Sequence, residues 1–181
     1  MKGIVFTELL DMINATFGEK MVDDILDECV LESGGAYTSA GTYDYKEMIT
    51  IVQALSARTD IPFKDLVYKY GYHLFSRFHE IMPQFFEKPE DAFAFFETID
   101  QTIHVEVKKL YPDAVLPKFT TEKTHDNELM MTYKSHCPFA DFASGLIAGC
   151  INHFREDISV ESKDDNSGEY FIRHYRMRRH D

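Results

Sequence analysis

The stretch from Phe93 to Asp113 reads FAFFETIDQTIHVEVKKLYPD. Its apolar residues recur at helical spacing, which predicts one long helix from Phe93 to Tyr111, ended by two lysines and then Pro112. One face of that helix carries an apolar stripe, made of Phe93, Phe96, Ile103, Val107 and Tyr111. His104 lies at the margin of this stripe, so its imidazole is predicted to point into apolar surroundings.

The helical pattern leaves two interpretations of His104 open. A histidine in such a place is most often a core or boundary residue whose ring bonds a backbone carbonyl. It can also be the ligand of a metal or a cofactor, because a neutral imidazole offers a lone pair. The pattern alone favours the first interpretation, and only residues elsewhere in the chain can favour the second.

The segments before this stretch are predicted to be helical. Apolar residues spaced by three or four define helices from Val5 to Phe17, from Met21 to Val30 and from Tyr45 to Leu55. Pro62 suits the first turn of a further helix that carries Leu66 to Phe78, and Pro83 ends or bends it.

The segments after the stretch change character. Alternating polarity and turn residues predict a hairpin of residues 119–123 and 129–135, and a second hairpin of 158–160 and 170–177. A helix from Phe139 to Phe154 lies between them, and Gly145 and Gly149 on it are predicted to permit close helix packing. The fold is therefore expected to be α+β, with a mainly helical N-terminal and middle part and a small C-terminal antiparallel sheet.

Length and charge narrow the classes of function. A chain of 181 residues, 44% of them hydrophobic, suits one domain over residues 1–181. The net charge of −12 repels phosphate backbones and anionic lipid, which argues against nucleic acid or a membrane as partner. No stretch approaches the roughly 20 apolar residues of a spanning helix, so a cytoplasmic protein is expected. Three cysteines without paired spacing do not suggest a disulfide framework.

The order of residues around His104 resembles the H-NOX family, the haem nitric oxide/oxygen binding domains related to the sensor part of soluble guanylate cyclase. The resemblance covers the whole chain. It is carried by the opening residues 1–6 (MKGIVF), by His104 with residues 108–113 (KKLYPD), by Leu116-Pro117, and by Tyr133-Lys134-Ser135.

The resemblance implies a haem b cofactor enclosed by the helices and the sheet. It gives His104 the role of the ligand that binds the haem iron, and Pro117 the role of pressing on and distorting the macrocycle. Tyr133 and Ser135 match the first two members of the family's Tyr-x-Ser-x-Arg motif, which holds the haem propionates. Cys137 stands where the motif has arginine, which predicts a looser haem or compensation from elsewhere, because an arginine–carboxylate pair is a strong contact.

The resemblance also implies which gas is sensed. By position, six apolar residues form the wall on the gas side of the iron: Val5, Leu9, Leu74, Phe78, Phe142 and Leu146. Family members that hold oxygen stably have tyrosine where this chain has Phe142, so the expected ligands of the ferrous haem are nitric oxide and carbon monoxide, not oxygen. The other interpretation is that these six residues are simply core.

A sensor of this kind needs a separate partner. The resemblance implies a histidine kinase or a cyclic-di-GMP enzyme encoded elsewhere, and no catalytic activity of the chain itself. The alternative function is a thiol-redox-responsive interaction domain with weak or no haem binding. It would act through Cys137, whose thiolate is expected to be stabilised by the start of the helix that follows.

Two charged segments near the C-terminus have simple interpretations. The acidic run from Glu161 to Asp165 is predicted to be a solvated turn. The basic residues near the C-terminus are either solvated or a docking site for an acidic partner surface; they are Arg173, Arg176, Arg178 and Arg179.

Overall fold

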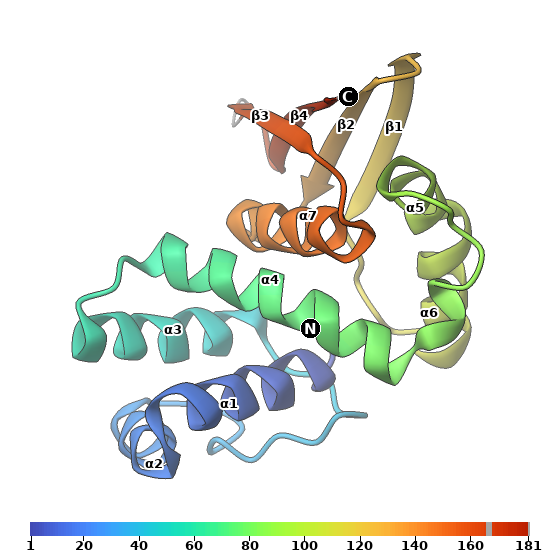
Figure 1. The fold of residues 1–181 in the computed structure, drawn as a ribbon. Helices are drawn as coiled ribbons and strands as arrows, with labels where there is room; N and C mark the ends of the chain where they lie inside the picture. Colours follow the sequence, from blue (N-terminus) through green and yellow to red (C-terminus); the bar gives the residue numbers. More distant parts are fainter. Residues whose placement is uncertain (166–167, 181) are drawn as a thin grey trace.

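The computed structural model describes residues 1–165 and 168–180 of the chain. The fold is α+β, as the sequence predicts (Figure 1). The helices are α1 (Ile4–Phe17), α2 (Glu19–Glu28), α3 (Tyr45–Thr59), α4 (Phe63–Ile81), α5 (Ala92–Thr98), α6 (His104–Leu110) and α7 (Ala140–Phe154). A 3₁₀ turn, Pro83–Phe85, follows α4, so the expectation that Pro83 ends or bends that helix is confirmed.

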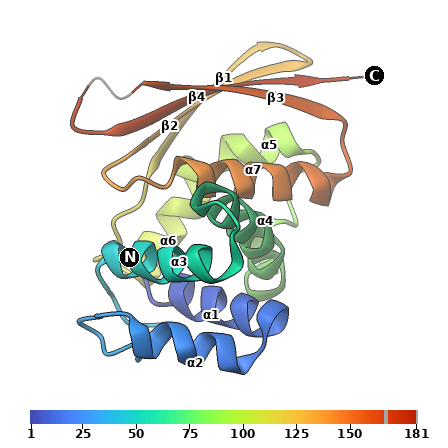
Figure 2. The same ribbon diagram turned by 90° about the vertical axis from the view of Figure 1, so that its left-hand side faces the viewer.

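Both predicted hairpins are present and pair with each other in one sheet. The strands are β1 (Lys118–His125), β2 (Glu128–Ser135), β3 (Ile158–Asp165) and β4 (Phe171–Arg179), in the order β1-β2-β4-β3 with every pair antiparallel. Residues 166 and 167, in the predicted turn of the second hairpin, lie outside the described residues. Figure 2 shows the sheet as an outer layer over α5 and α7, with α4 beneath them and α1 and α2 at the opposite end of the molecule.

The predicted close packing of glycines on α7 is confirmed, because α7 crosses α4 almost backbone to backbone. A Cβ atom added to Gly145 would lie 2.0 Å from the carbonyl oxygen of Tyr68, and one added to Gly71 would lie 2.2 Å from that of Phe142. No side chain fits at such distances, so only glycine allows this approach. The two helices therefore form a tightly fixed centre of the fold.

Two apolar clusters fill the interior on either side of this centre. One is formed by the four helices α1, α2, α3 and α4, and it includes Leu9 and Leu74, each at most 1% exposed. The other joins α5 and α7 to the inner face of the sheet, where Met131, Tyr175 and Met177 are buried. The N-terminal helices and the sheet thus have separate cores that share α4 and α7.

The prediction of one regular helix from Phe93 to Tyr111 is wrong in its middle. A π-helical segment, Ile99–Ile103, separates α5 from α6, and α6 begins at His104. Phe93 and Phe96 are buried as the stripe predicts, but α6 contains no buried residue. Apolar periodicity could not reveal the wider turn, because the contacts made there are polar.

The prediction of a solvated turn for Glu161 to Asp165 is also wrong. These residues are exposed, but they belong to the edge strand β3, opposite the arginines of β4. Asp164, for example, pairs with Arg173 across the strands, with Oδ1 2.5 Å from Nε. Opposite charges on neighbouring strands stabilise an extended pairing that composition alone does not predict.

Among the residues that the structure describes, no helix combines the length and apolarity needed to cross a membrane.

Candidate cofactor-binding site

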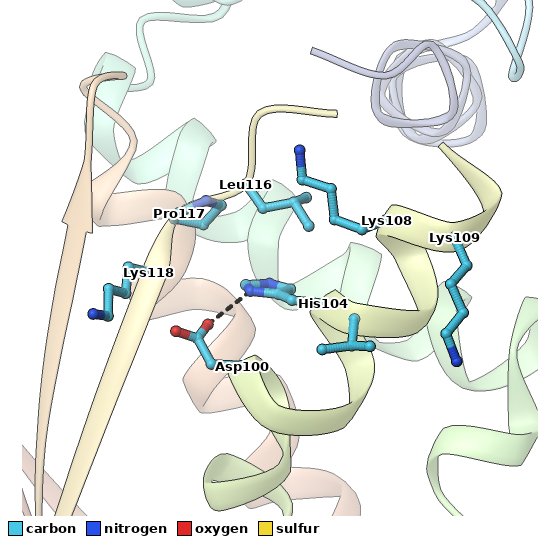
Figure 3. Close-up of a pocket in the computed structure, with 8 residues that line it drawn as sticks. Asp100, His104, Lys108, Lys109, Leu116, Pro117 and Lys118 are labelled. Atoms are coloured by element: carbon cyan, nitrogen blue, oxygen red, sulfur yellow. Dashed lines mark hydrogen bonds and ion pairs between the residues drawn. The ribbon is translucent and has the colours of Figure 1, made fainter. Parts of the chain in front are cut away.

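His104 is held by a carboxylate one turn before it. Its Nδ1 lies 2.8 Å from Oδ1 of Asp100 (Figure 3). Oδ2 of Asp100 accepts a hydrogen bond from the backbone N–H of Phe119 at 3.1 Å. The π-helical segment and the first residues of β1 therefore fix one carboxylate, and this carboxylate fixes the imidazole. Histidines that bind metals are commonly oriented by a carboxylate in this way.

The second ring nitrogen of His104 is left with a lone pair. The side chain is 19% exposed, and burial lowers its pKa, although the charge and hydrogen bond of Asp100 act in the opposite direction. The ring is therefore neutral near pH 7 and donates Nδ1–H to the carboxylate, which makes Nε2 the acceptor. Within residues 1–165 and 168–180, no hydrogen bond is made to Nε2, so this nitrogen can bind a metal.

An open pocket of about 490 Å³ adjoins His104. Figure 3 shows the segment that carries Leu116 and Pro117 passing opposite the imidazole, so Pro117 and His104 line the same pocket. The lining residues are Asp100, His104, Val105, Lys108, Lys109, Leu116, Pro117 and Lys118.

Tyr133 is connected to His104 through Phe119. The Phe119 ring centroid lies 5.9 Å from that of His104 and 5.5 Å from that of Tyr133. Tyr133 is buried, and this burial raises its pKa to about 12, so its hydroxyl remains a hydrogen-bond donor. That hydroxyl donates to the carbonyl oxygen of Cys137 at 3.4 Å, and Oγ of Ser135 accepts from the N–H of Cys137 at 3.0 Å. The hydroxyls of Tyr133 and Ser135 therefore both bond the backbone of Cys137.

The environment of Cys137 differs from the one expected for a reactive thiol. Helix α7 begins at Ala140 with Phe139 as its cap, so Cys137 precedes the helix by three residues. Burial raises the pKa of its thiol. The expectation of a thiolate stabilised by a helix start is therefore wrong, which removes the main argument for a redox-responsive Cys137.

No arginine on β4 takes the place of the missing motif arginine. Arg173 stands opposite Tyr133 in the pairing of β2 with β4, but its guanidinium binds Asp141 at 2.7 Å and also Asp164. The other C-terminal arginines are also paired, Arg176 and Arg178 with Glu128, and Arg179 with Asp91 and Glu156. The predicted basic patch is thus largely neutralised within the chain, which argues against a docking site there.

The six residues expected to form the gas-side wall lie in one apolar cluster. Leu9 and Leu74 are buried members of this cluster, and the other four pack against it half-buried; they are Val5, Phe78, Phe142 and Leu146. The Tyr70 ring lies 5.3 Å from that of Phe142, but its hydroxyl donates to the backbone oxygen of Val5. The hydroxyl of the tyrosine whose ring lies beside Phe142 therefore has its proton engaged.

Sequence reasoning missed three residues of this site: Asp100, Phe119 and Tyr70. The spacing of Asp100, four residues before His104, is the usual spacing of a side-chain pair on a helix and could have drawn attention to it. No sequence signal connects Phe119 or Tyr70 to the site, because their partners are far along the chain.

Comparisons with known proteins identify the family of the chain. The family profile described as Haem-NO-binding matches residues 2–162. An unliganded Fe(II) H-NOX protein from K. algicida, solved as the mutant A71G, is 38% identical, with 100% of this chain and 97% of that chain covered and a TM-score of 0.92. The H-NOX from Shewanella woodyi, solved with IWP-051 in the Fe(II)CO state, is 39% identical over 99% of this chain and 95% of its own, with a TM-score of 0.85.

A third solved structure, the S. oneidensis H-NOX protein in the Fe(II)NO state, is 26% identical, covers both chains fully and has a TM-score of 0.90. No curated protein matches this sequence. The extent of the family match and the identity to the first two structures establish the class: this is a haem-based gas-sensor domain. The chain belongs to the Haem-NO-binding, or H-NOX, family.

The residues of the site fit a haem. A neutral imidazole with one free nitrogen, oriented by a carboxylate, is a suitable axial ligand of haem iron. The apolar cluster suits the flat apolar ring of a haem, and the buried hydroxyl of Tyr133 with the half-buried one of Ser135 suits its polar edges. The departure from the family pattern at Cys137 lies beside the hydroxyls of Tyr133 and Ser135 and not at His104.

Proposed function

We propose that the chain senses nitric oxide through a ferrous haem b whose iron is bound by Nε2 of His104. The observation that carries this proposal is the neutral, Asp100-oriented imidazole facing the segment of Pro117 across a pocket. Ferrous haem supplies the reversible binding of a diatomic gas, and the chain supplies orientation and selectivity.

Each residue of the site has a proposed role toward the haem. Asp100 holds the imidazole in the tautomer that leaves Nε2 free. Pro117 would contact the macrocycle, and the hydroxyl of Tyr133 would donate to a propionate in place of its present contact with the carbonyl of Cys137. The hydroxyl of Ser135 only accepts from the N–H of Cys137, so it would donate its own proton to a propionate without losing that contact. Without the motif arginine, two neutral donors hold the propionates, and the haem is expected to dissociate faster than in a relative with arginine.

The gas-side wall is proposed to select nitric oxide and carbon monoxide over oxygen. Bound oxygen carries partial negative charge, and a buried hydrogen bond to such charge contributes about 1.5–3 kcal/mol. The wall of Val5, Leu9, Leu74, Phe78, Phe142 and Leu146 offers no side-chain donor, and the hydroxyl of Tyr70 already donates to Val5. Nitric oxide does not depend on such a donor.

The chain is proposed to act on a separate partner and not as an enzyme. The apolar wall lacks a general acid or base within reach of a substrate. A histidine kinase or a cyclic-di-GMP enzyme is the proposed partner, because the family to which the chain belongs consists of sensor domains. Binding of the gas would be read by that partner as a shift between two conformations of the domain.

Absorption spectroscopy of the purified, haem-loaded protein tests this function. The reduced protein is exposed separately to nitric oxide, carbon monoxide and air. We expect spectral changes with the first two gases and none that is stable and reversible in air. A protein that stays colourless when haem is plentiful, or one that takes up oxygen reversibly, would contradict the proposal.

A further inference from the structure

Two sequence segments at opposite ends of the helical part meet in the structure. Lys2 belongs to the opening segment of the chain, and Tyr111 and Asp113 follow α6, 109 and 111 positions later. The ammonium of Lys2 lies 4.9 Å from the ring centroid of Tyr111 and 3.4 Å from each carboxylate oxygen of Asp113. The opening segment is therefore in direct contact with the segment that leads to Pro117.

Thr42 completes a closed set of polar contacts with these residues. Its hydroxyl accepts a hydrogen bond from the Lys2 ammonium at 2.7 Å and donates to Oδ2 of Asp113 at 2.6 Å. The hydrogen bond from Thr42 is the largest cause that lowers the pKa of Asp113, and a hydrogen bond from its own backbone and then the charge of Lys2 act in the same direction. The side chain of Lys2 is only 11% exposed, so its position is well defined.

The N-terminal side of this contact set is anchored to the rigid part of the fold. Lys2 and Thr42 form a β-bridge, and the N–H of Gly3 donates to the carbonyl of Gly41 at 2.8 Å. Helix α1, which carries Val5 and Leu9 of the gas-side wall, begins two residues after Lys2. Lys2 and Thr42 thus have a fixed position relative to that wall.

The other side of the contact set is weakly packed. Helix α6 has no buried residue, and Leu110 and Val115, on either side of Asp113, are 67% and 75% exposed. Within residues 110–116 Ala114 is buried and Leu116 is half-buried, but the small side chain of Ala114 buries little apolar area. Apolar burial therefore does little to fix this segment, although Pro117 comes directly after it. Polar contacts are left to determine where this segment lies.

We infer that Lys2, Thr42 and Asp113 are positioning residues, which fix the segment of Pro117 relative to His104 by tying it to the gas-side half of the domain. This inference rests on the proposed function as far as the haem is concerned. It predicts that breaking the contact set changes the mobility of residues 111–118 and, in the loaded protein, the coordination of the iron by His104.

The test compares Asp113→Asn and the double variant Thr42→Val/Asp113→Asn with a matched control. The control is Asp126→Asn, which removes an exposed pair with Lys123 of the same 3.4 Å length. Hydrogen exchange of residues 111–118 is measured in the purified full chain, together with residues 4–17 as an internal reference. We expect exchange at 111–118 to rise by about two- to tenfold in the double variant and less in the single one, with residues 4–17 and the control unchanged.

The second measurement uses the same proteins loaded with haem. Resonance Raman spectra should show a shifted iron–histidine band in the double variant and the wild-type band in the control. Unchanged exchange at 111–118 would overturn the inference, and raised exchange with an unchanged band would overturn the role in positioning. If the chain bound no haem, the proposed function would fail, while hydrogen exchange would still decide whether the contact set holds the segment.

Discussion

The two sides of the proposed haem site are built differently. The gas side comes from α1, α4 and α7, where buried apolar residues and glycine contacts bring backbones together. The histidine side comes from the π-helical segment, α6 and the loop to β1, where neither helical segment contains a buried residue. There, hydrogen bonds and ion pairs of Asp100, Lys2 and Asp113 define the geometry.

This difference assigns different tasks to the two sides. A close-packed wall cannot adjust without strain, so it suits the discrimination between gases by the presence or absence of a donor. A segment held by a few exchangeable polar contacts can adopt a second position at low cost, so it suits the transmission of a signal. Mutations on the gas side are thus expected to change the selectivity between gases, and mutations on the histidine side to change the transmission of the signal.

The largest effect is expected from removing the imidazole on the histidine side. In His104→Gly the haem has no axial ligand from the chain, so its dissociation should be at least about tenfold faster. Added imidazole should restore the wild-type spectrum, which a merely unfolded variant could not do. Haem transfer to an excess of apomyoglobin measures the rate, and His125→Gly, at an exposed strand end, is the control. Unchanged retention and spectrum in His104→Gly would remove His104 from the site.

A smaller effect is expected from placing a donor in the gas-side wall. Phe142→Tyr adds a hydroxyl next to Tyr70, whose own hydroxyl is occupied. Affinity for oxygen should rise by about one to two powers of ten while that for carbon monoxide changes little. Oxygen titration of the reduced protein checks this, with Phe142→Leu as the variant that adds no donor. Equal oxygen affinities in both variants would mean that Phe142 does not face the gas.

A loss of stability, with the gas selectivity unchanged, is expected from adding a methyl group where α4 and α7 touch. Gly145→Ala places a methyl group 2.0 Å from the Tyr68 carbonyl oxygen, so α4 and α7 must separate. The free energy of unfolding should fall by about 1–3 kcal/mol. Denaturant unfolding measures it, and Gly168→Ala, where a methyl group would meet nothing within 4 Å, is the control. Equal stability of the two variants would show that the contact between α4 and α7 accommodates a methyl group without loss of packing.

The smallest effect is expected at Glu128, the first residue of the inner strand β2. Hydrogen bonds from Arg178, Thr124 and Arg176 lower the pKa of Glu128 to about 2, from an ordinary value near 4.5. Because the folded-state pKa is below the unfolded one, this carboxylate stabilises the fold above about pH 4.5 and loses that effect as the pH falls toward 2. Glu128→Gln should therefore be slightly less stable at pH 7, and the difference from wild type should narrow below pH 4.5. A constant difference across this range would contradict the assigned ion pairs.

The sequence predicted the parts of the fold that depend on local apolar spacing. The helices that carry Leu9 and Leu74 and both hairpins follow from periodicity, and His104 with Pro117 follows from the order of motifs. The pairing of β2 with β4 and the contact of Lys2 with Asp113 do not, because their partners are distant in the chain.

The polar geometry around His104 was equally out of reach of pattern reasoning. The π-helical segment exists where Asp100 bonds both His104 and Phe119, and no hydrophobic period records such a contact. The thiol of Cys137 was misjudged for a related reason, since its burial is decided by the packing around it and not by its distance from a helix in sequence.

The iron–histidine stretching band of the reduced, gas-free protein tests the central claim most directly. Resonance Raman spectra are recorded for protein grown with natural histidine and with ¹⁵N-histidine. We predict a band that shifts to lower frequency on labelling. The band should also move to lower frequency in Asp100→Asn, because the neutral amide lacks the negative charge that makes the imidazole a stronger electron donor to the iron. A haem-loaded protein without any label-sensitive band would contradict the assignment of His104 as the ligand of the iron.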